Sequence, residues 1–158
     1  MKSSPYITKA GMTRLNEELT AIWIRRREVV KALSAAAAEG DRSENAEYIY
    51  RKKELRGLDR RIRYLQRRMP DLRVIADKPD DDSKIFFAAS VSLETDQGEW
   101  VVYRIVGPDE IDHEKGNISL DSPLSKALLG KQVDDEVTIN LPDTGVRKVY
   151  YVTAINYL

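Results

Sequence analysis

The chain has 158 residues with 42% apolar side chains, enough for one domain or two small ones, and it contains no cysteine and a single histidine. These absences exclude a disulfide framework, a thiolate nucleophile and zinc sites built from Cys or from a His cluster. The 26 basic and 26 acidic side chains balance overall, but residues 1–79 carry 19 Lys and Arg against 11 Asp and Glu, a net charge of +8, and the remainder carries −8.

The first 40 residues predict a long helix after a short extended segment. Residues 1–7 look extended, and Thr8 can accept a hydrogen bond from a free amide at a helix start. From there apolar residues recur at intervals of three and four, which is the spacing of a coiled-coil seam, with Arg26 as its one polar member. We expect the helix to end near Glu39, because Gly40 can adopt the left-handed conformation of a C-terminal cap. The apolar seam residues are Leu15, Leu19, Ile22, Val29, Leu33 and Ala36.

A second helix with the same rhythm is expected from about Ser43 until Pro70 stops it. Two helices joined by so few residues must lie antiparallel, and about 30 residues at about 1.5 Å each give a hairpin of about 45 Å. The seam residues of the second helix are Tyr48, Leu55, Leu58, Ile62, Leu65 and Met69.

Four acidic residues gather at the expected tip of this hairpin, near residues 39–47: Glu39, Asp41, Glu44 and Glu47. Asp41 and Glu44 are three residues apart, so their carboxylates can lie side by side and hold a Mg²⁺ ion that keeps most of its shell for waters or another molecule. The same spacing also describes a capping box, in which each side chain accepts a hydrogen bond from a free backbone amide. The motif by itself leaves both interpretations open.

Nine cations follow the tip along the second helix, opposed within that span only by Glu54 and Asp59. Because the seam positions are apolar, these cations must cover the exposed faces, where they form a stripe suited to the phosphates of a polyanion. A solvated helix face is the alternative. We expect Trp23, Tyr50 and Tyr64 to pack within the hairpin rather than stack on bases. The residues of this predicted polyanion-binding stripe, which are RNA-binding residues if the polyanion is RNA, are Arg51, Lys52, Lys53, Arg56, Arg60, Arg61, Arg63, Arg67 and Arg68.

The hydrophobic period changes to two beyond a polar linker at residues 77–83. We expect strands over 85–94 and 99–106, a short strand over 117–120, and two further strands over 136–141 and 147–157. A short helix begins after Ser122, which supplies an N-cap followed by proline. One helix on a small antiparallel sheet gives an α+β class, with predicted domains at residues 1–76 and 84–158.

Several motifs resemble the Gre family of bacterial transcript-cleavage factors. They are the tip Gly40-Asp41-Arg42-Ser43-Glu44-Asn45-Ala46-Glu47-Tyr48, then Phe86-Phe87-Ala88, Ser122-Pro123 and Ala127-Leu128-Leu129-Gly130. The resemblance covers the whole chain, and Arg42 with the basic stripe is more similar to the GreB branch than to GreA. It implies a coiled-coil hairpin that enters the secondary channel of RNA polymerase and an FKBP-like α+β domain that docks outside the channel.

The resemblance also assigns roles to particular residues. It implies that Asp41 and Glu44 are the catalytic and metal-binding residues, which help to hold a second Mg²⁺ and a water in the polymerase active site. No metal is then expected on the isolated protein, which is an accessory factor rather than an enzyme. Asp121, Ser122 and Pro123 fall in the expected polymerase-docking region, although helix capping also accounts for them.

The expected function is stimulation of RNA cleavage in backtracked, arrested complexes, with polymerase and the nascent RNA 3′ end as partners. We expect the protein to be cytoplasmic, because the sequence has neither a signal-peptide pattern nor an apolar run of 18 residues. We also expect a monomer. Two alternatives remain: a secondary-channel regulator that acts by occlusion without cleavage, and a structural coiled-coil adaptor.

Overall fold

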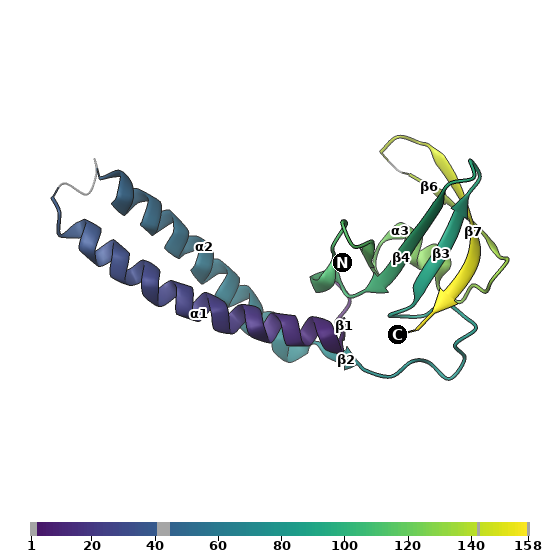
Figure 1. The fold of residues 1–158 in the computed structure, drawn as a ribbon, viewed down its shortest axis with the longest axis horizontal. Helices are drawn as coiled ribbons and strands as arrows, with labels where there is room; N and C mark the ends of the chain where they lie inside the picture. Colours follow the sequence, from purple (N-terminus) through teal and green to yellow (C-terminus); the bar gives the residue numbers. More distant parts are fainter. Residues whose placement is uncertain (1–2, 41–44, 142, 158) are drawn as a thin grey trace. The chain divides into compact units, whose positions relative to one another are not determined.

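A computed structural model describes residues 3–40, 45–141 and 143–157 of the chain. It divides into two compact units, Met12–Leu72 and Met1–Gly11 with Arg73–Leu158 (Figure 1). The sequence predicted a division at the linker, with residues 1–76 together. In the structure the first 11 residues belong to the second unit, because an N-terminal strand pairs there with residues that follow the hairpin.

The hairpin consists of two helices, α1 (Lys9–Ala37) and α2 (Ala46–Arg68) (Figure 1). The Thr8 hydroxyl accepts a hydrogen bond from the Gly11 amide at 3.0 Å, which confirms the predicted cap of α1. The predicted apolar seam positions are all buried or half-buried, so the three-four periodicity located the contact face correctly. Helix α2 ends at Arg68, and Pro70 lies in the short 3₁₀ helix η1 (Met69–Asp71).

The start of α2 corrects one expectation. The helix begins at Ala46, three residues later than expected, and its N-cap is Asn45. Ser43 lies outside the described residues. The Asn45 side-chain oxygen accepts from the Tyr48 amide at 3.0 Å. Its side-chain nitrogen donates to the Ala36 carbonyl of α1 at 2.8 Å, so one amide caps α2 and ties it to α1.

The second unit contains a five-stranded sheet in the order β5-β4-β3-β7-β6. Its strands are β3 (Ser90–Thr95), β4 (Trp100–Val106), β5 (Asn117–Ser119), β6 (Glu136–Asn140) and β7 (Arg147–Asn156). The sheet is mixed rather than antiparallel as predicted, because β5 runs parallel to β4. The first predicted strand also begins later than expected, at Ser90, because Ala88 has a φ of +73°.

One face of this sheet forms the core of the unit, which includes Val91, Leu93, Ile105 and Val152 at less than 2% exposure. Helix α3 (Pro123–Leu128) adds Leu128 to this core. The predicted class, an antiparallel helical hairpin followed by a small α+β domain, is confirmed.

A short parallel pair, β1 (Tyr6–Thr8) with β2 (Arg73–Ile75), was not expected from the sequence. Beside it, the buried Glu110 of the 3₁₀ helix η2 (Pro108–Glu110) accepts hydrogen bonds from the Thr8 amide at 3.0 Å and the Gly107 amide at 2.9 Å. The Thr8 hydroxyl also donates to this carboxylate. The first turn of α1 is thus held within the sheet unit.

Candidate functional site

The described ends of the two helices frame the predicted acidic tip. Helix α1 ends at Ala37, two residues before the predicted Glu39, and Gly40 has a φ of +129°, a conformation that side chains disfavour. Asp41 and Glu44, the predicted catalytic and metal-binding pair, lie outside the described residues. Among residues 3–40, 45–141 and 143–157, no three or more His, Cys, Asp or Glu side chains are grouped so that they could hold a metal ion.

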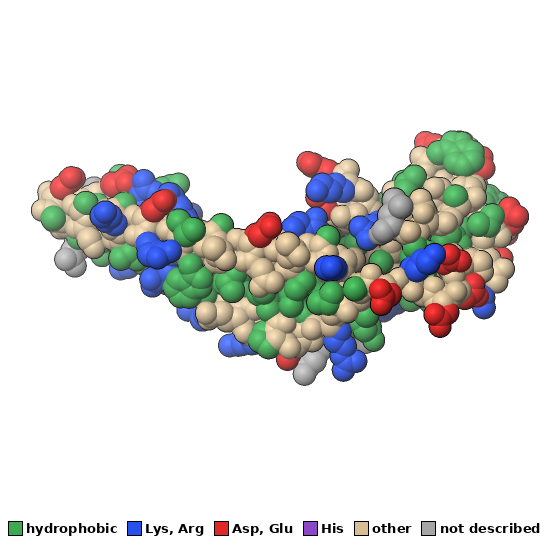
Figure 2. Space-filling view, turned by 60° about the horizontal axis from the view of Figure 1, so that its bottom comes forward, with side chains coloured by type: hydrophobic (Ala, Val, Ile, Leu, Met, Phe, Trp, Pro, Cys, Tyr) green, Lys and Arg blue, Asp and Glu red, His purple; other side chains and the backbone are tan. Residues whose placement is uncertain are grey.

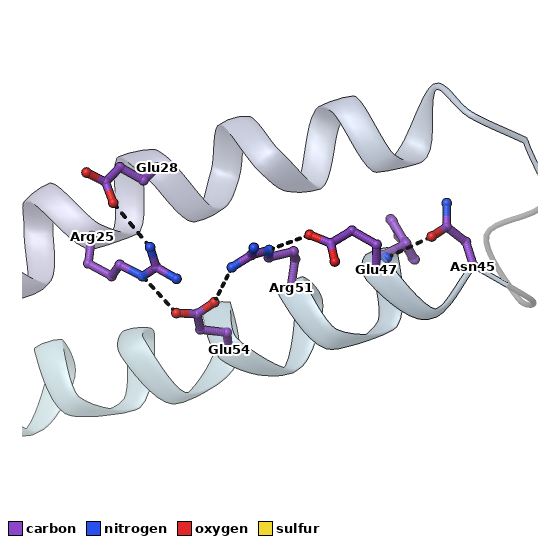
Figure 3. Close-up of polar contacts among 7 residues, drawn as sticks. Arg25, Glu28, Asn45, Glu47, Arg51 and Glu54 are labelled. Atoms are coloured by element: carbon purple, nitrogen blue, oxygen red, sulfur yellow. Dashed lines mark hydrogen bonds and ion pairs between the residues drawn. The ribbon is translucent and has the colours of Figure 1, made fainter.

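A chain of ion pairs runs along the hairpin from the first turn of α2 (Figure 3). Arg51 donates to Glu47 at 2.8 Å and to Glu54 at 3.0 Å. Glu54 also accepts from Arg25 of α1 at 2.8 Å, and Arg25 donates to Glu28 at 3.2 Å. Glu47, one of the four predicted tip acids, is therefore already neutralised by a cation of its own helix.

These contacts shift the pKa values of Glu54 and Arg51. The hydrogen bond from Arg25 is the main reason why the pKa of Glu54 lies below its ordinary value, and the bond from Arg51 adds to the effect. The pKa of Arg51 is raised, first by Glu47 and then by Glu54. The two arginines thus favour the ionised form of Glu54, which lies between them.

Two further ion pairs join the helices nearer the base. Arg26, the polar member of the predicted seam, is half-buried and donates to Asp59 of α2 at 2.7 Å. Arg61 donates to both oxygens of Glu18, at 2.6 and 2.9 Å, and this hydrogen bonding lowers the pKa of Glu18. The cross-helix pairs explain how a strongly charged hairpin keeps a single register.

The structure divides the nine predicted RNA-binding cations into two groups. Four of them interact with other residues of the protein. Arg51 and Arg61 form the ion pairs described above, the Lys52 Nζ lies 5.7 Å from the ring centroid of Tyr48, and Arg68 also has an interaction within the protein. The other five are exposed, and none forms an ion pair within the described part of the chain. They are Lys53, Arg56, Arg60, Arg63 and Arg67.

These five residues, which we call the cation line, repeat at intervals of three and four and therefore share one side of α2. They lie opposite the apolar seam, which sits about half a helical turn away. On the face drawn in Figure 2, Lys and Arg side chains are frequent along the hairpin, whereas Asp and Glu gather on the sheet unit. Of the nine cations in the predicted stripe, the cation line contains those that are exposed and form no ion pair within the described residues.

The aromatic side chains of the hairpin are more exposed than predicted. Tyr50 is 60% exposed, Tyr64 42% and Trp23 40%, so packing within the hairpin does not account for these rings. The prediction was wrong because aromatic residues at the margins of a seam can lie outside it, and spacing alone does not separate the two positions.

The predicted docking residues lie at the start of α3. Ser122 accepts a hydrogen bond from the Ser125 amide at 3.2 Å, which confirms it as the N-cap, and Pro123 is exposed. Asp121 accepts from the Ser4 amide at 2.9 Å and from the Ser4 hydroxyl. Sequence reasoning missed Ser4, because no local pattern connects positions 117 residues apart.

No helix within the described residues is long and apolar enough to cross a membrane.

Comparisons with known proteins cover both units. Residues 5–74 match the family described as transcription elongation factor, N-terminal, and residues 79–157 match transcription elongation factor, GreA/GreB, C-term. The chain is 53% identical to transcription elongation factor GreB of Xanthomonas axonopodis pv. citri, over 99% of this chain and 93% of that protein. It is 48% identical to the GreB of Pseudomonas aeruginosa, over 98% and 91%. Among solved structures, Gfh1 of Thermus aquaticus is similar at 27% identity over 98% and 99% of the chains, with a TM-score of 0.45.

Proposed function

Because the chain belongs to the GreA/GreB family of transcription elongation factors, we propose that it stimulates RNA polymerase to cleave RNA in backtracked, arrested complexes. The observation that carries this proposal is the match of both units to the family, together with the presence of Asp41 and Glu44 at the tip. Removal of the displaced RNA segment would return a 3′ end to the active site and allow elongation to resume.

In this proposal the hairpin enters the polymerase secondary channel with its tip foremost, and the reaction takes place in the polymerase active site. Asp41 and Glu44 would help to hold a second Mg²⁺, because carboxylates are the ligands that this ion prefers and two of them leave most of its octahedral shell open. When bound, the ion would position and activate the attacking water. The factor alone would be inert, since it completes a site that it does not possess.

The described residues would serve this function by positioning the tip. The ion pair between Arg25 and Glu54 and the bond from Asn45 to Ala36 both join α1 to α2. Such cross-links restrict the motion of one helix against the other near the tip. A reacting group that is misplaced by about 1 Å can lose about a hundredfold in rate, so a firm support matters for the acids beyond it.

We assign the predicted RNA contacts mainly to the cation line. An RNA segment extruded through the secondary channel carries one phosphate per nucleotide, and exposed cations without an internal partner can neutralise phosphates without first breaking an ion pair. Arg51 and Arg61 would instead hold the hairpin together, because their acidic partners already engage them.

Docking on polymerase is proposed for Asp121, Ser122 and Pro123. Pro123 is exposed and free to contact a partner, whereas Asp121 is bonded to Ser4 and can act by holding the N-terminal segment in place. The test compares polymerase affinity for Pro123→Ala and Ser4→Ala. Loss of affinity in both would mean that the docking surface depends on the N-terminal segment, and loss in Pro123→Ala alone would mean direct contact at α3.

The decisive experiment incubates a backtracked polymerase complex with Mg²⁺ and the protein and looks for short 3′ RNA fragments. Asp41→Asn and Glu44→Gln should abolish the fragments while polymerase binding persists, because each change removes a charge without altering volume. Glu39→Gln removes a charge at the same end of the hairpin and is the matched control, which should still yield fragments.

Two results would overturn the assignment. Inhibition of elongation without fragments by the unaltered protein would indicate a regulator that acts by occlusion. Preserved cleavage in both the Asp41 and Glu44 variants would show that these carboxylates are not required, and the catalytic assignment would have to be dropped.

A further inference from the structure

Three positions of α2 form a second line on its outer surface, beside the cation line. Tyr50, Gly57 and Tyr64 are seven residues apart, which is close to two helical turns, so they follow one another along one side of the helix. Both rings are substantially exposed, Tyr50 at 60% and Tyr64 at 42%. We call these three positions the tyrosine line.

The middle position leaves the helix surface bare between the rings. Glycine inside a helix costs about 1 kcal/mol relative to alanine. Among the described residues, and apart from the chain neighbours and the backbone of the helix itself, a Cβ atom at Gly57 would meet only the end of Arg60, at 3.9 Å, which is ordinary contact. Packing within the described hairpin therefore does not require a glycine here, and the bare stretch fits the close approach of another molecule.

An ion-paired arginine backs each ring. The Arg51 guanidinium lies 5.4 Å from the ring centroid of Tyr50, and Arg61 lies 5.2 Å from that of Tyr64. Both arginines are fixed by carboxylates, Arg51 by Glu47 and Glu54 and Arg61 by Glu18. The arginines restrict the orientation of the rings, while the exposed part of each ring remains open to solvent.

The cation line runs along the other side of the rings. Lys53 follows Tyr50 by three residues, and Arg60 precedes Tyr64 by four. Arg67 follows Tyr64 by three. Residues three and four apart are neighbours on a helix surface, so every ring has an exposed cation beside it. The two rings and the cations beside them thus follow one side of the helix, and the rings are 14 residues apart, which is about 21 Å.

We propose that the tyrosine line is a stacking track for the bases of single-stranded RNA, whose phosphates contact the cation line. This inference rests on the proposed function and deepens it, because it assigns base contacts to Tyr50 and Tyr64. Every nucleobase has a π face, so stacking is tolerant of sequence, as a factor acting on arbitrary transcripts requires. A span of about 21 Å corresponds to about six nucleotides at the spacing of about 3.4 Å per stacked nucleotide.

An acidic protein surface is the competing occupant, and the aromatic residues argue against it. Such a surface would engage the cation line through charge alone and would gain nothing from two exposed rings separated by a bare stretch of helix. Bases require both a flat apolar face and room for the sugar and phosphate to pass close to the backbone.

The first test needs no polymerase. The full chain is titrated with a six-nucleotide single-stranded RNA and with the same backbone lacking bases, and binding is followed by anisotropy of a label on the RNA. Each stacked base should tighten binding by about 5- to 160-fold, the factor that corresponds to about 1–3 kcal/mol, so with two rings the RNA with bases should bind at least about 30-fold more tightly. Tyr50→Leu and Tyr64→Leu should reduce this ratio, whereas Tyr50→Phe should retain it.

Trp23→Leu supplies the matched control. Trp23 is 40% exposed, and the Arg26 guanidinium lies 5.9 Å from its ring centroid. Trp23 therefore resembles the tyrosines in exposure and cation contact, but it belongs to α1. Its replacement should leave the ratio unchanged. Equal affinity for the two RNAs, an unchanged ratio in both leucine variants, or equally tight binding of a hexaglutamate peptide would each overturn the stacking track.

The second test uses backtracked polymerase complexes in which the extruded RNA carries either normal or abasic nucleotides. The unaltered protein should cleave abasic complexes at a higher half-saturating concentration, and Tyr50→Leu should remove the difference. If the unaltered protein releases no fragments at all, the proposed function fails, while the titration still decides whether the tyrosines bind bases.

Discussion

Gly11 and Gly57 both lie inside helices, but Gly11→Ala is expected to lower the free energy of unfolding and Gly57→Ala to raise it. Helix propensity alone predicts that both changes stabilise the protein by about 0.8–1 kcal/mol. At Gly57 no close contact opposes this gain, because among the described residues, apart from the chain neighbours and the backbone of the helix itself, only the end of Arg60 lies within 4 Å of the new methyl group. Gly57→Ala should therefore raise stability by about that amount.

At Gly11 the new methyl group would lie 2.0 Å from Oε1 of Glu110 and 2.4 Å from its Cδ. Glu110 is only 7% exposed, and it cannot move away without losing its hydrogen bonds from Thr8 and Gly107. Overpacking costs about 1–3 kcal/mol, and each lost hydrogen bond to a charged group about 1.5–3 kcal/mol. If one of these hydrogen bonds is lost, subtraction of the propensity gain leaves a destabilisation of about 1.5–5 kcal/mol for Gly11→Ala.

Urea unfolding monitored by far-UV circular dichroism gives the two free energies. Hydrogen exchange then locates the loss, which should appear first at the Thr8 and Gly107 amides. The double variant Gly11→Ala, Glu110→Ala should be less destabilised than the sum of the two single changes, because the clash no longer exists. A stabilising or neutral Gly11→Ala would refute the packing of Glu110 against α1.

Three further predictions concern the hairpin. Folding lowers the pKa of Glu54, so the contribution of Glu54 to stability is complete above the ordinary Glu pKa of about 4.3 and is lost as the pH falls through the folded-state value. When the free energy of unfolding is measured from pH 7 to pH 3, it should therefore fall less steeply for Glu54→Gln than for the unaltered protein. Asn45→Ala removes the cap of α2 and should lower the free energy of unfolding by about 0.5–2 kcal/mol in the same urea assay. Replacement of Arg60, Arg63 and Arg67 by Gln should impair cleavage more as the backtracked RNA lengthens, and it should reduce the salt dependence of cleavage. An equal defect at every RNA length would assign these arginines to another role.

The sequence by itself determined the features that depend on local periodicity and on single residue types. The three-four spacing located the seam of both helices, and the period of two located the strands that follow the linker. Thr8, Ser122 and Pro70 marked helix boundaries that the structure confirms. Such signals are readable because they arise from residues within a few positions of one another.

The tip motif over residues 40–48 also indicated the family, because the motif consists of residue identities at consecutive positions and depends on no distant contact. The matches of both units to the family confirm that identification. The roles of Asp41 and Glu44 stay a prediction, because both residues lie outside the described part of the chain.

Tertiary structure alone decided which charges are engaged and which are available. Sequence spacing did not distinguish the nine cations of α2. In the structure Arg61 pairs with Glu18 of α1. Arg51 pairs with Glu54 of its own helix, and Glu54 also pairs with Arg25 of α1. The same holds for the bond from Ser4 to Asp121. These contacts join residues 29 to 117 positions apart, and their formation depends on the register of whole elements, which no short window of sequence encodes.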